Sequence, residues 1–511
     1  MKLGEMPLAT LSDVPFDEAL AYGCADADAT CRLKPELQTR MTAMGLDDVY
    51  RLELSTYHLI DRMMMVGMKP DLKRFEQVSE RLQAEIDTVQ SSLAKLTKRN
   101  DFNANSSHHV RELIYDGYGL PEMKRTPGGD PSTNDIILEA LEQQYGLTYP
   151  AIPLIRDYRE YYKLKNTFVD RLPDFVNRHP FDSRVHATFR TTRVVTGRLA
   201  ASDPNLLAQP EHGDWAYLYK WGWVAEPGHV LAAWDESQIE LRVLAHLSGD
   251  PVLKEAYTYV CPHTKPAGQR VCERDDCVLR ADLHARLAHR IFGVMPSQQS
   301  KSKHRLPSKT TNFGIAMGMQ SQGLCLQLRK NGLTDADEDM AQEWIDGTNT
   351  LYKEVPKYKS HKIAEARRVG FVRCLSGRVR YIGGIHSWDR AVKAESERFA
   401  FSTPIQEGAQ YILKTAEAHL WKELRRLWKL GYWVEPLKQV HDALYLEMED
   451  GLQDYMHKVM QDCLVTKVGH LLSVPLEIEG ESGMNLAPTE IKDPDTKKVV
   501  WSNPDGMRGF E

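Results

Sequence analysis

The chain has 511 residues, of which 42% are hydrophobic, so it can bury a sizeable core and form several domains. No apolar run spans a bilayer, the first residues lack a signal peptide's apolar segment, and eight cysteines in this length make no disulfide scaffold, so we expect a cytoplasmic protein with no membrane partner. The formal net charge of −6 argues mildly against a nucleic-acid partner, although a basic groove can lie on an acidic protein.

Helical patterns dominate the first third of the chain. Apolar residues recur at three- and four-residue steps from Phe75 to Leu96, which predicts a long amphipathic helix. The methionines just before it are interpreted as core filling: Met63, Met64, Met65 and Met68. A polar, turn-rich loop at 124–135 precedes a second helical block, which ends in the basic, aromatic stretch "YREYYKLKNTFVDRL".

The rest of the chain alternates between strand and helix patterns. Short strand-like runs fill 181–250, an irregular Cys-rich stretch fills 251–280, and helical patterns continue to about residue 430. The segment "WVEPLKQVHDALYLEME" then predicts two strands that turn at His441 and Asp442. This order predicts an α+β fold whose sheet is assembled from discontinuous segments.

Two aspartates lie at expected strand ends. An apolar run from Val230 to Trp234 ends on Asp235, and Asp442 lies at the turn of the later hairpin. If the strands converge at one sheet edge, the two carboxylates are able to hold two Mg²⁺ ions about 3.5–4 Å apart. The alternative is a pair of unrelated exposed acids at turns.

The segment "KHRLPSKTTNFGIAMGM" spaces its functional candidates by four residues. Arg305, Lys309, Phe313 and Met317 thereby fall on one helical face, with the two cations near the helix start. Cations beside the positive end of a helix dipole suit a triphosphate, and the aromatic ring suits stacking on a base. The alternative is a solvated basic turn followed by a core stripe.

A second cluster has metal-ligand character. Cys261, His263, Cys272 and Cys277 are four zinc-competent residues within 17 positions, but their spacing is not that of a standard CxxC pair. Two interpretations stay open: a structural zinc site within the insertion 261–277, or a loop of free thiols.

Six blocks together resemble the family A DNA polymerases, the bacterial DNA polymerase I class, in that family's order and over nearly the whole chain. They are "KLKNTFVDRLP", "TTRVVTGRLAASDPNL", "DESQIELRVLAHLSGD", "RLPSKTTNFG", "ERFAFSTPIQEGAQYILK" and "QVHDALYLE". In addition, "YGCADADAT", with Tyr22 and Asp26, is similar to the last motif of the family's proofreading exonuclease.

The resemblance implies a right-hand fold with an antiparallel-sheet palm, helical fingers and a helical thumb. It places an exonuclease remnant at 1–33, the thumb at 34–180, the palm at 181–250 and 386–511 with a C-terminal tail, and the fingers at 251–385. It also implies a monomeric, template-directed DNA polymerase of a bacterium or phage that extends a primer with dNTPs through two Mg²⁺ ions and lacks complete proofreading. The alternatives are a single-subunit RNA polymerase and a catalytically weak nucleic-acid-binding accessory protein.

The resemblance also implies residue roles. Asp235 and Asp442 would bind both metals, and Lys309 would protonate the departing pyrophosphate. The expected nucleotide-binding residues are His284, Arg305, Lys309, Phe313, Gln238, Met317 and the steric gate Glu240. The residues expected to contact primer and template near the new base pair are Arg198, Asn205, Arg398, Gln406 and His441. Two lysines of the thumb are either phosphate contacts or solvated surface residues: Lys163 and Lys165.

Some positions depart from the family pattern. Ala443 replaces the usual Glu of the last motif, which removes a third carboxylate, and Met317 replaces a Tyr. Pro307 lies between the two cations, and since proline is tolerated only in a first helical turn, we expect this helix to begin late. Polar DNA-contacting residues are also replaced, by Leu207, Ala208 and Ser402.

Overall fold

The computed structural model describes residues 14–126, 128–210, 215–265, 270–333, 335–492 and 499–510. Residues 1–13 of the expected exonuclease remnant, 266–269 of the Cys-rich insertion and 493–498 of the tail lie outside this described part. Tyr22 and Asp26 are exposed on one continuous helix, α1, which also includes the expected domain boundary at residue 33.

Helices make up most of the described chain. They are α1 (Phe16–Ala43), α2 (Asp47–Val66), α3 (Leu72–Thr97), α4 (Ser107–Arg111), α5 (Asp135–Tyr145), α6 (Ala151–Lys163), α7 (Leu172–Asn177), α8 (Ala216–Trp221), α9 (Ile239–Ser248), α10 (Pro251–Thr258), α11 (Asp275–Ala281), α12 (Leu283–Phe292), α13 (Leu306–Ala316), α14 (Ser321–Lys330), α15 (Glu338–Leu351), α16 (Glu354–Val369), α17 (Arg390–Lys429) and α18 (Gln453–Gln461). Among the described residues, none of the helices is long and apolar enough to cross a membrane.

The main sheet has five strands in the order β11-β8-β3-β7-β6, and all its neighbours are antiparallel. Its strands are β3 (His229–Glu236), β6 (Val434–Val440), β7 (Ala443–Glu449), β8 (Ile478–Gly483) and β11 (Arg508–Gly509). Three two-stranded ribbons pair β1 (Thr188–Arg190) with β2 (Ala200–Ser202), β4 (Phe371–Arg373) with β5 (Val379–Tyr381), and β9 (Glu490–Lys492) with β10 (Val499–Ser502). The predicted sheet from discontinuous segments and the predicted hairpin at 433–449 are therefore confirmed.

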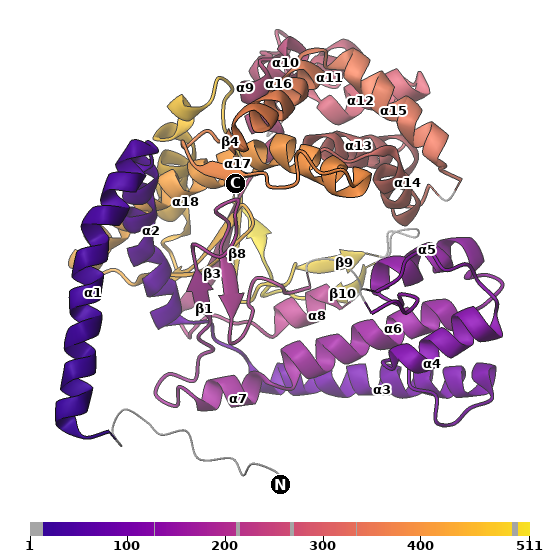
Figure 1. Cartoon of the computed structure of the whole chain (residues 1–511), viewed down its shortest axis with the longest axis horizontal. Helices are drawn as coiled ribbons and strands as arrows, with labels where there is room; N and C mark the ends of the chain where they lie inside the picture. The colour runs from indigo at the N-terminus through magenta and orange to yellow at the C-terminus, as the bar shows by residue number, and fades with distance from the viewer. Residues whose placement is uncertain are drawn as a thin grey trace.

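Figure 1 shows how the helices surround this sheet. Helices α9 to α16 gather at the top of the view, and α3 to α6 form a separate layer at the lower right. The largest apolar core joins the sheet to α2, α9, α17 and the first half of α3. A second core lies between the latter half of α3 and α4 to α6. The main sheet thus shares one core with the helices that pack on it, whereas α4 to α6 pack on the end of α3 around another.

Helix α3 confirms the predicted amphipathic helix. Its spaced apolar residues are buried from Phe75 to Leu93, whereas Leu96, in the last turn, is exposed. Asp71 begins the helix by accepting the backbone N–H groups of Lys73 and Arg74 at 3.0 and 3.1 Å. The core interpretation of the methionines holds for Met63 and Met68 and is wrong for Met65, which is 64% exposed.

The stretch 251–280 is more helical than its composition predicts. Helix α10 begins immediately after Asp250, which accepts the N–H groups of Val252 and Leu253 at 2.9 and 3.1 Å. Helix α11 covers the end of the same stretch. The prediction of irregular structure was wrong for these two helices and right for the described residues between them, 259–265 and 270–274. At α10, Asp250 and Pro251 form a strong helix start that the density of Cys, Pro and Gly obscured.

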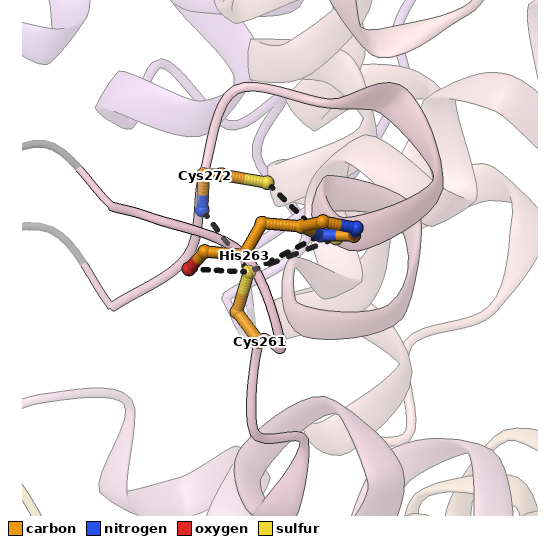
Figure 2. Close-up of side chains that lie close together, drawn as sticks. Cys261, His263 and Cys272 are labelled. Atoms are coloured by element: carbon orange, nitrogen blue, oxygen red, sulfur yellow. Dashed lines mark hydrogen bonds between the residues drawn. The ribbon is translucent and has the colours of Figure 1, made fainter.

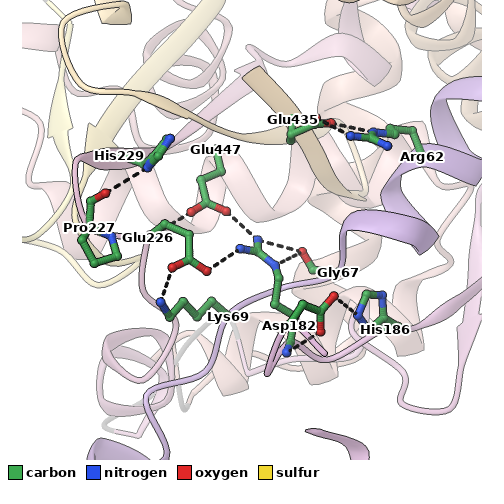
Figure 3. Close-up of polar contacts among 11 residues, drawn as sticks. Arg62, Gly67, Lys69, Asp182, His186, Glu226, Pro227, His229, Glu435 and Glu447 are labelled. Atoms are coloured by element: carbon green, nitrogen blue, oxygen red, sulfur yellow. Dashed lines mark hydrogen bonds and ion pairs between the residues drawn. The ribbon is translucent and has the colours of Figure 1, made fainter. Parts of the chain in front are cut away.

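A buried arginine ties β7 to the segment before β1. Arg184 donates to Glu447 at 2.5 Å, to Glu226 at 3.2 Å and to the carbonyl oxygen of Gly67 at 3.0 Å. Glu447 is fully buried, and its second oxygen accepts the backbone N–H of Glu226 at 2.6 Å. Figure 3 shows Glu447, Glu226 and Gly67 around one guanidinium. The network fixes β7, and hence the Asp442 turn, against the chain that follows α2.

Candidate active site

The two aspartates of the sequence prediction come together at one sheet edge. Strands β3 and β7 are neighbours, and their register pairs Asp235 with Ala443, the residue after Asp442. The backbone N–H of Glu236 also donates to the carbonyl oxygen of Asp442 at 3.4 Å. Because His441 adopts a left-handed conformation with φ of 51°, the β6–β7 hairpin turns within two residues and leaves Asp442 at its tip.

A cavity of about 540 Å³ lies at this edge. Eight of the predicted site residues line it: Asp235, Gln238, Glu240, His284, Arg305, Lys309, Phe313 and Asp442. Six lining residues were not predicted from the sequence: Glu236, Ser237, Ile239, Lys301, Leu306 and Glu479. The cavity therefore has acids from the sheet on one wall and cations from α13 and its preceding turn on the other.

The acidic wall has the chemistry of a divalent-cation site. Burial raises the pKa of Asp442, while Arg198 and His441 oppose this change. Its Oδ1 atom is buried and has no hydrogen-bond partner within the protein. Such an oxygen is costly to bury unless a cation or a donor satisfies it, and Mg²⁺ prefers carboxylate oxygens. Asp235 and Asp442 therefore fit the metal that the sequence predicts.

A third carboxylate, that of Glu479, lies beside Asp235 on the side away from Ala443. Strand β8 lies on the other side of β3, and its register pairs Glu479 with Asp235. Since paired residues of neighbouring strands project to the same face, Ala443, Asp235 and Glu479 form a row, and Glu479 lines the same cavity. The alternating pattern "EIEGE" at 477–481 could have indicated a strand that carries acids. It could not have indicated which strand lies next to it, because strand pairing is not a local property of the sequence.

Glu236 is a further acid that sequence reasoning missed. It is 3% exposed, and neither carboxylate oxygen has a hydrogen-bond partner. Burial, followed by the nearby charges of Asp442 and Asp235, raises the pKa of Glu236 well above its ordinary value. These surroundings favour the neutral, protonated side chain and thereby limit the negative charge beside the two aspartates.

The opposite wall is basic. A π-helical turn at Lys301–Arg305 leads into α13, and Pro307 lies in the first turn of this helix, as expected. Arg305 donates to Asp282 at 2.6 Å, and the Lys309 ammonium lies 5.8 Å from the centre of the Phe313 ring. Lys309 is exposed. Lys301, Arg305 and Lys309 thus bring positive charge to this wall of the cavity.

His284 supplies a neutral donor between the two walls. Burial lowers the pKa of His284 to about 4, and the neighbouring Lys309 and Arg305 add to this effect against Asp282. The side-chain oxygen of Asn312 accepts from the Tyr352 hydroxyl at 3.2 Å, so its NH₂ group faces the Nδ1 atom of His284 at 3.1 Å. In this network Nδ1 accepts, and Nε2 carries the proton that can be donated.

Glu240 and Gln238 lie at the start of α9. Gln238 adopts a left-handed conformation with φ of 55° at the N-cap position, and its side-chain oxygen accepts from the Tyr257 hydroxyl at 3.2 Å. Glu240 is 6% exposed and accepts from Arg198 at 2.8 Å. Burial raises the pKa of Glu240, an effect that Arg198 opposes. Helix α9 ends at Ser248, and Gly249 caps it in a left-handed conformation with φ of 69°.

The remaining predicted contacts lie outside this cavity. Arg398 faces Glu395 at 3.4 Å, and the amide of Gln406 donates to the sulfur of Met317, at the end of α13, at 2.9 Å. The side chain of Asn205 caps a local turn. Lys163 is exposed, whereas Lys165 pairs with Asp170 at 2.6 Å. Their roles as DNA contacts stay predictions.

A second cavity, of about 990 Å³, shares Asp235 and Glu479 with the first. His441 and Lys220 line it, as does Phe510 of the tail. The Phe510 ring stacks on Trp234 at 5.4 Å with an angle of 8° between the rings. Asp235 therefore lies where two cavities meet.

These features can be compared with known proteins. The sequence model described as "DNA polymerase family A" matches residues 72–487. The chain belongs to DNA polymerase family A. Its tail from residue 488 onward lies outside the matched family segment, yet supplies β11 to the main sheet.

Relatives within family A support the same assignment. DNA polymerase I of Chloroflexus aurantiacus is 30% identical over 482 residues, which are 93% of this chain and 47% of the relative. The thermostable DNA polymerase I of Thermus thermophilus is 33% identical over 422 residues, or 82% of this chain and 46% of the relative. The chain thus spans about half the length of these family members.

A solved family structure shares the fold. The POL domain of Pol1 from M. smegmatis, in complex with DNA primer-template and dNTP, matches with a TM-score of 0.74 at 26% identity. The match covers 88% of this chain and 72% of that chain. The predicted α+β polymerase fold is therefore confirmed.

Proposed function

We propose that this chain is a template-directed DNA polymerase that extends a primer 3′ end with dNTPs. The observation that carries the proposal is the cavity in which Asp235 and Asp442 face Arg305, Lys309 and His284, in a member of family A. Acids on one wall suit metal ions, and cations on the other suit a triphosphate. A nucleoside triphosphate with bound metal satisfies both walls at once.

Asp235 and Asp442 hold two Mg²⁺ ions in this proposal, supported by the unpartnered Oδ1 atom of Asp442. When bound, the ions supply charge stabilisation for the attacking 3′ oxygen and for the leaving pyrophosphate. Arg305 and Lys309 orient the phosphates, and Lys309 protonates the pyrophosphate as it departs. His284, kept neutral by burial, donates a hydrogen bond to a phosphate oxygen.

The second cavity supports a place for the primer end. Because it shares Asp235 and Glu479 with the first cavity, a 3′ hydroxyl on the His441 side would meet a nucleotide on the Lys309 side at the acids between them. Primer and template would then continue past Arg198, Asn205, Arg398 and Gln406. Lys163 and Lys165 would contact phosphates after Lys165 exchanges its partner Asp170.

The domain assignment follows the same proposal. The helices between residues 34 and 180 form the thumb, those between 251 and 385 the fingers, and the main sheet the palm. The chain works as a monomer.

We also propose that these 511 residues excise no mismatched 3′ end, because Asp26 lies on an exposed helix and, within the described residues, belongs to no group of metal-binding side chains. A gel assay of 3′ excision on a mismatched primer tests this point.

Primer extension with Asp235→Asn and Asp442→Asn tests the polymerase proposal. We expect each variant to lose at least about a hundredfold in rate, because the metals supply several kcal/mol of transition-state stabilisation. Primer-template affinity should change little. Asp339→Asn, on the exposed start of α15, is the matched control and should extend normally.

Three results would contradict the proposal. Near wild-type turnover in either aspartate variant would reject the two-metal site. Faster extension with rNTPs than with dNTPs would favour a single-subunit RNA polymerase. Tight primer-template binding with no extension by the unmodified chain would favour an accessory protein.

A further inference from the structure

The fingers segment contains a side-chain cluster that the polymerase reaction does not use. Cys261, His263, Cys272 and Cys277 bring one ligand atom each to within 4.8 Å of all the others, and no second group of this kind occurs among the described residues. Figure 2 shows Cys261 and His263 on one arm of the loop and Cys272 on the other, with their side chains close together. Residues at the two ends of an insertion therefore converge on one point.

Ordinary packing and hydrogen bonding do not account for this convergence. The sulfur atoms of Cys277, Cys272 and Cys261 lie 3.3, 3.8 and 3.9 Å from the Nδ1 atom of His263. A neutral imidazole has one acceptor nitrogen, so it cannot accept from three thiols at once. None of the three cysteines forms a disulfide, and the sulfurs of Cys261 and Cys277 are 3.7 Å apart, against about 2.05 Å for a bonded pair.

The distances match a tetrahedral metal centre. With Zn–S bonds of about 2.3 Å and Zn–N bonds of about 2.0–2.1 Å, a tetrahedron places two sulfurs about 3.8 Å apart and a sulfur and a nitrogen about 3.5 Å apart. The observed separation of the Cys261 and Cys277 sulfurs, 3.7 Å, is close to the first value. The three sulfur–nitrogen distances, 3.3–3.9 Å, lie on either side of the second. We infer that Cys261, His263, Cys272 and Cys277 bind one Zn²⁺ ion.

The ligand set assigns this ion a structural role. Four protein ligands complete a tetrahedron and leave no position for water or substrate. The three cysteines are at most 6% exposed, and soft thiolate ligands select zinc over magnesium. Binding would join the chain after α10 to the start of α11, and its free energy would count toward the local folding of this segment.

The site lies one short helix away from the nucleotide cavity. Cys277 belongs to α11, and Asp282, which follows this helix, accepts the N–H groups of His284 and Ala285 at 2.9 Å. The same Asp282 accepts from Arg305 at 2.6 Å. Near the other end of the cluster, Arg270 donates to the carbonyl oxygens of Ala256 and Ala281. Zinc would therefore hold α11 in place and, through Asp282, help to position His284 and Arg305.

Metal analysis of the full chain, purified without chelator, tests the binding itself. We expect close to one equivalent of zinc, and, after replacement by Co²⁺, the visible absorption bands of a tetrahedral thiolate site. Cys272→Ser and His263→Ala should lose the metal, whereas His263→Cys, which restores four ligands, should keep it. Cys325→Ser removes a buried cysteine elsewhere in the fingers and should retain a full equivalent.

A different combination of results would contradict the zinc site. Less than a tenth of an equivalent of zinc, together with native-state alkylation of all three thiols or a disulfide between two of them, would overturn the zinc site. Neither outcome depends on polymerase activity.

A second measurement tests the positioning role, which rests on the proposed function. After removal of zinc with a chelator and transfer to chelator-free buffer containing Mg²⁺, amide hydrogen exchange should rise first in 270–281, and the KM for dNTP should rise several-fold while kcat changes less. Equal loss of kcat with unchanged KM would reject the positioning role and leave the metal site standing.

Discussion

Glu240 fills the space beside the sheet edge as a buried carboxylate held by Arg198 at 2.8 Å. In the proposed reaction this position lies next to C2′ of the incoming sugar, so the side chain would clash with a ribose hydroxyl. We expect Glu240→Ala to raise incorporation of rNTP relative to dNTP by about tenfold or more, the scale of a lost steric clash. Competition between the two nucleotides on one primer-template measures this ratio.

The control for the gate is an exposed acid far from the cavity. Glu490→Ala, on β9, should leave the ratio unchanged. An unchanged ratio in Glu240→Ala as well would reject the gate, and would mean that Glu240 serves only to hold Arg198.

Glu479 is a second residue whose importance follows from its neighbours. It shares a row with Asp235 and Ala443, and it is the acid that can stand in for the one missing at Ala443. We expect Glu479→Gln to lower extension about tenfold and to raise the Mg²⁺ concentration needed for half-maximal rate. Primer extension over a Mg²⁺ titration measures both effects.

Adding a carboxylate on the other side of Asp235 provides the matching control. Ala443→Glu should recover part of the rate in the Glu479→Gln background, because the two positions flank the same aspartate and act on one site. Full activity of the single variant Glu479→Gln would show that two carboxylates suffice here.

At the scale of elements, the position of Asp442 depends on the anchoring of β7. Arg184 and Glu447 are 7% and 0% exposed in their side chains, and removal of one partner leaves the other charge buried without compensation. We expect Arg184→Met to reduce the free energy of unfolding by about 3–5 kcal/mol. Urea unfolding followed by tryptophan fluorescence reports on the core that contains Trp223 and Trp234.

An exposed ion pair provides the comparison. Arg32 lies 2.8 Å from Asp28 on α1 with 79% of its side chain exposed, so Arg32→Met should change stability by less than about 1 kcal/mol. The double variant Arg184→Met with Glu447→Gln should be less destabilised than the sum of its single variants. Equal effects of Arg184→Met and Arg32→Met would mean that the buried network contributes little.

At the scale of the whole molecule, the features that the sequence predicted well are those that depend on local sequence patterns. Helix α3 and the β6–β7 hairpin follow from patterns within a few turns or residues, and the site segments follow from resemblance over short blocks. The pairing of β8 with β3, and with it Glu479, depends on contacts more than 240 residues apart, which no local pattern contains. The exposure of Met65 likewise depends on which face of α2 meets the sheet.

The cysteine cluster shows the same limit. Four candidate ligands within 17 residues left both a zinc site and free thiols open, because spacing alone does not tell whether a loop folds back on itself. The distance between the Cys261 and Cys277 sulfurs and the distances from all three sulfurs to the His263 ring show that the loop folds back on itself. The buried, unpartnered Glu236 was missed for a related reason, since a charged residue at a strand end is ordinarily assumed to face water.

The row formed by Ala443, Asp235 and Glu479 makes the site sensitive to chain length in β3. Alternate residues of a strand face opposite sides, so deletion of one residue between 230 and 234 would turn Asp235 toward the core and put Glu236 in its place between Ala443 and Glu479. An acid would still stand at the edge, but with a longer side chain and different neighbours. Insertion or deletion of an even number of residues would keep each side chain on its present face of the sheet, but would change the residues on β7 and β8 with which it pairs. For this strand, the count of residues is as much a part of the site as their identity.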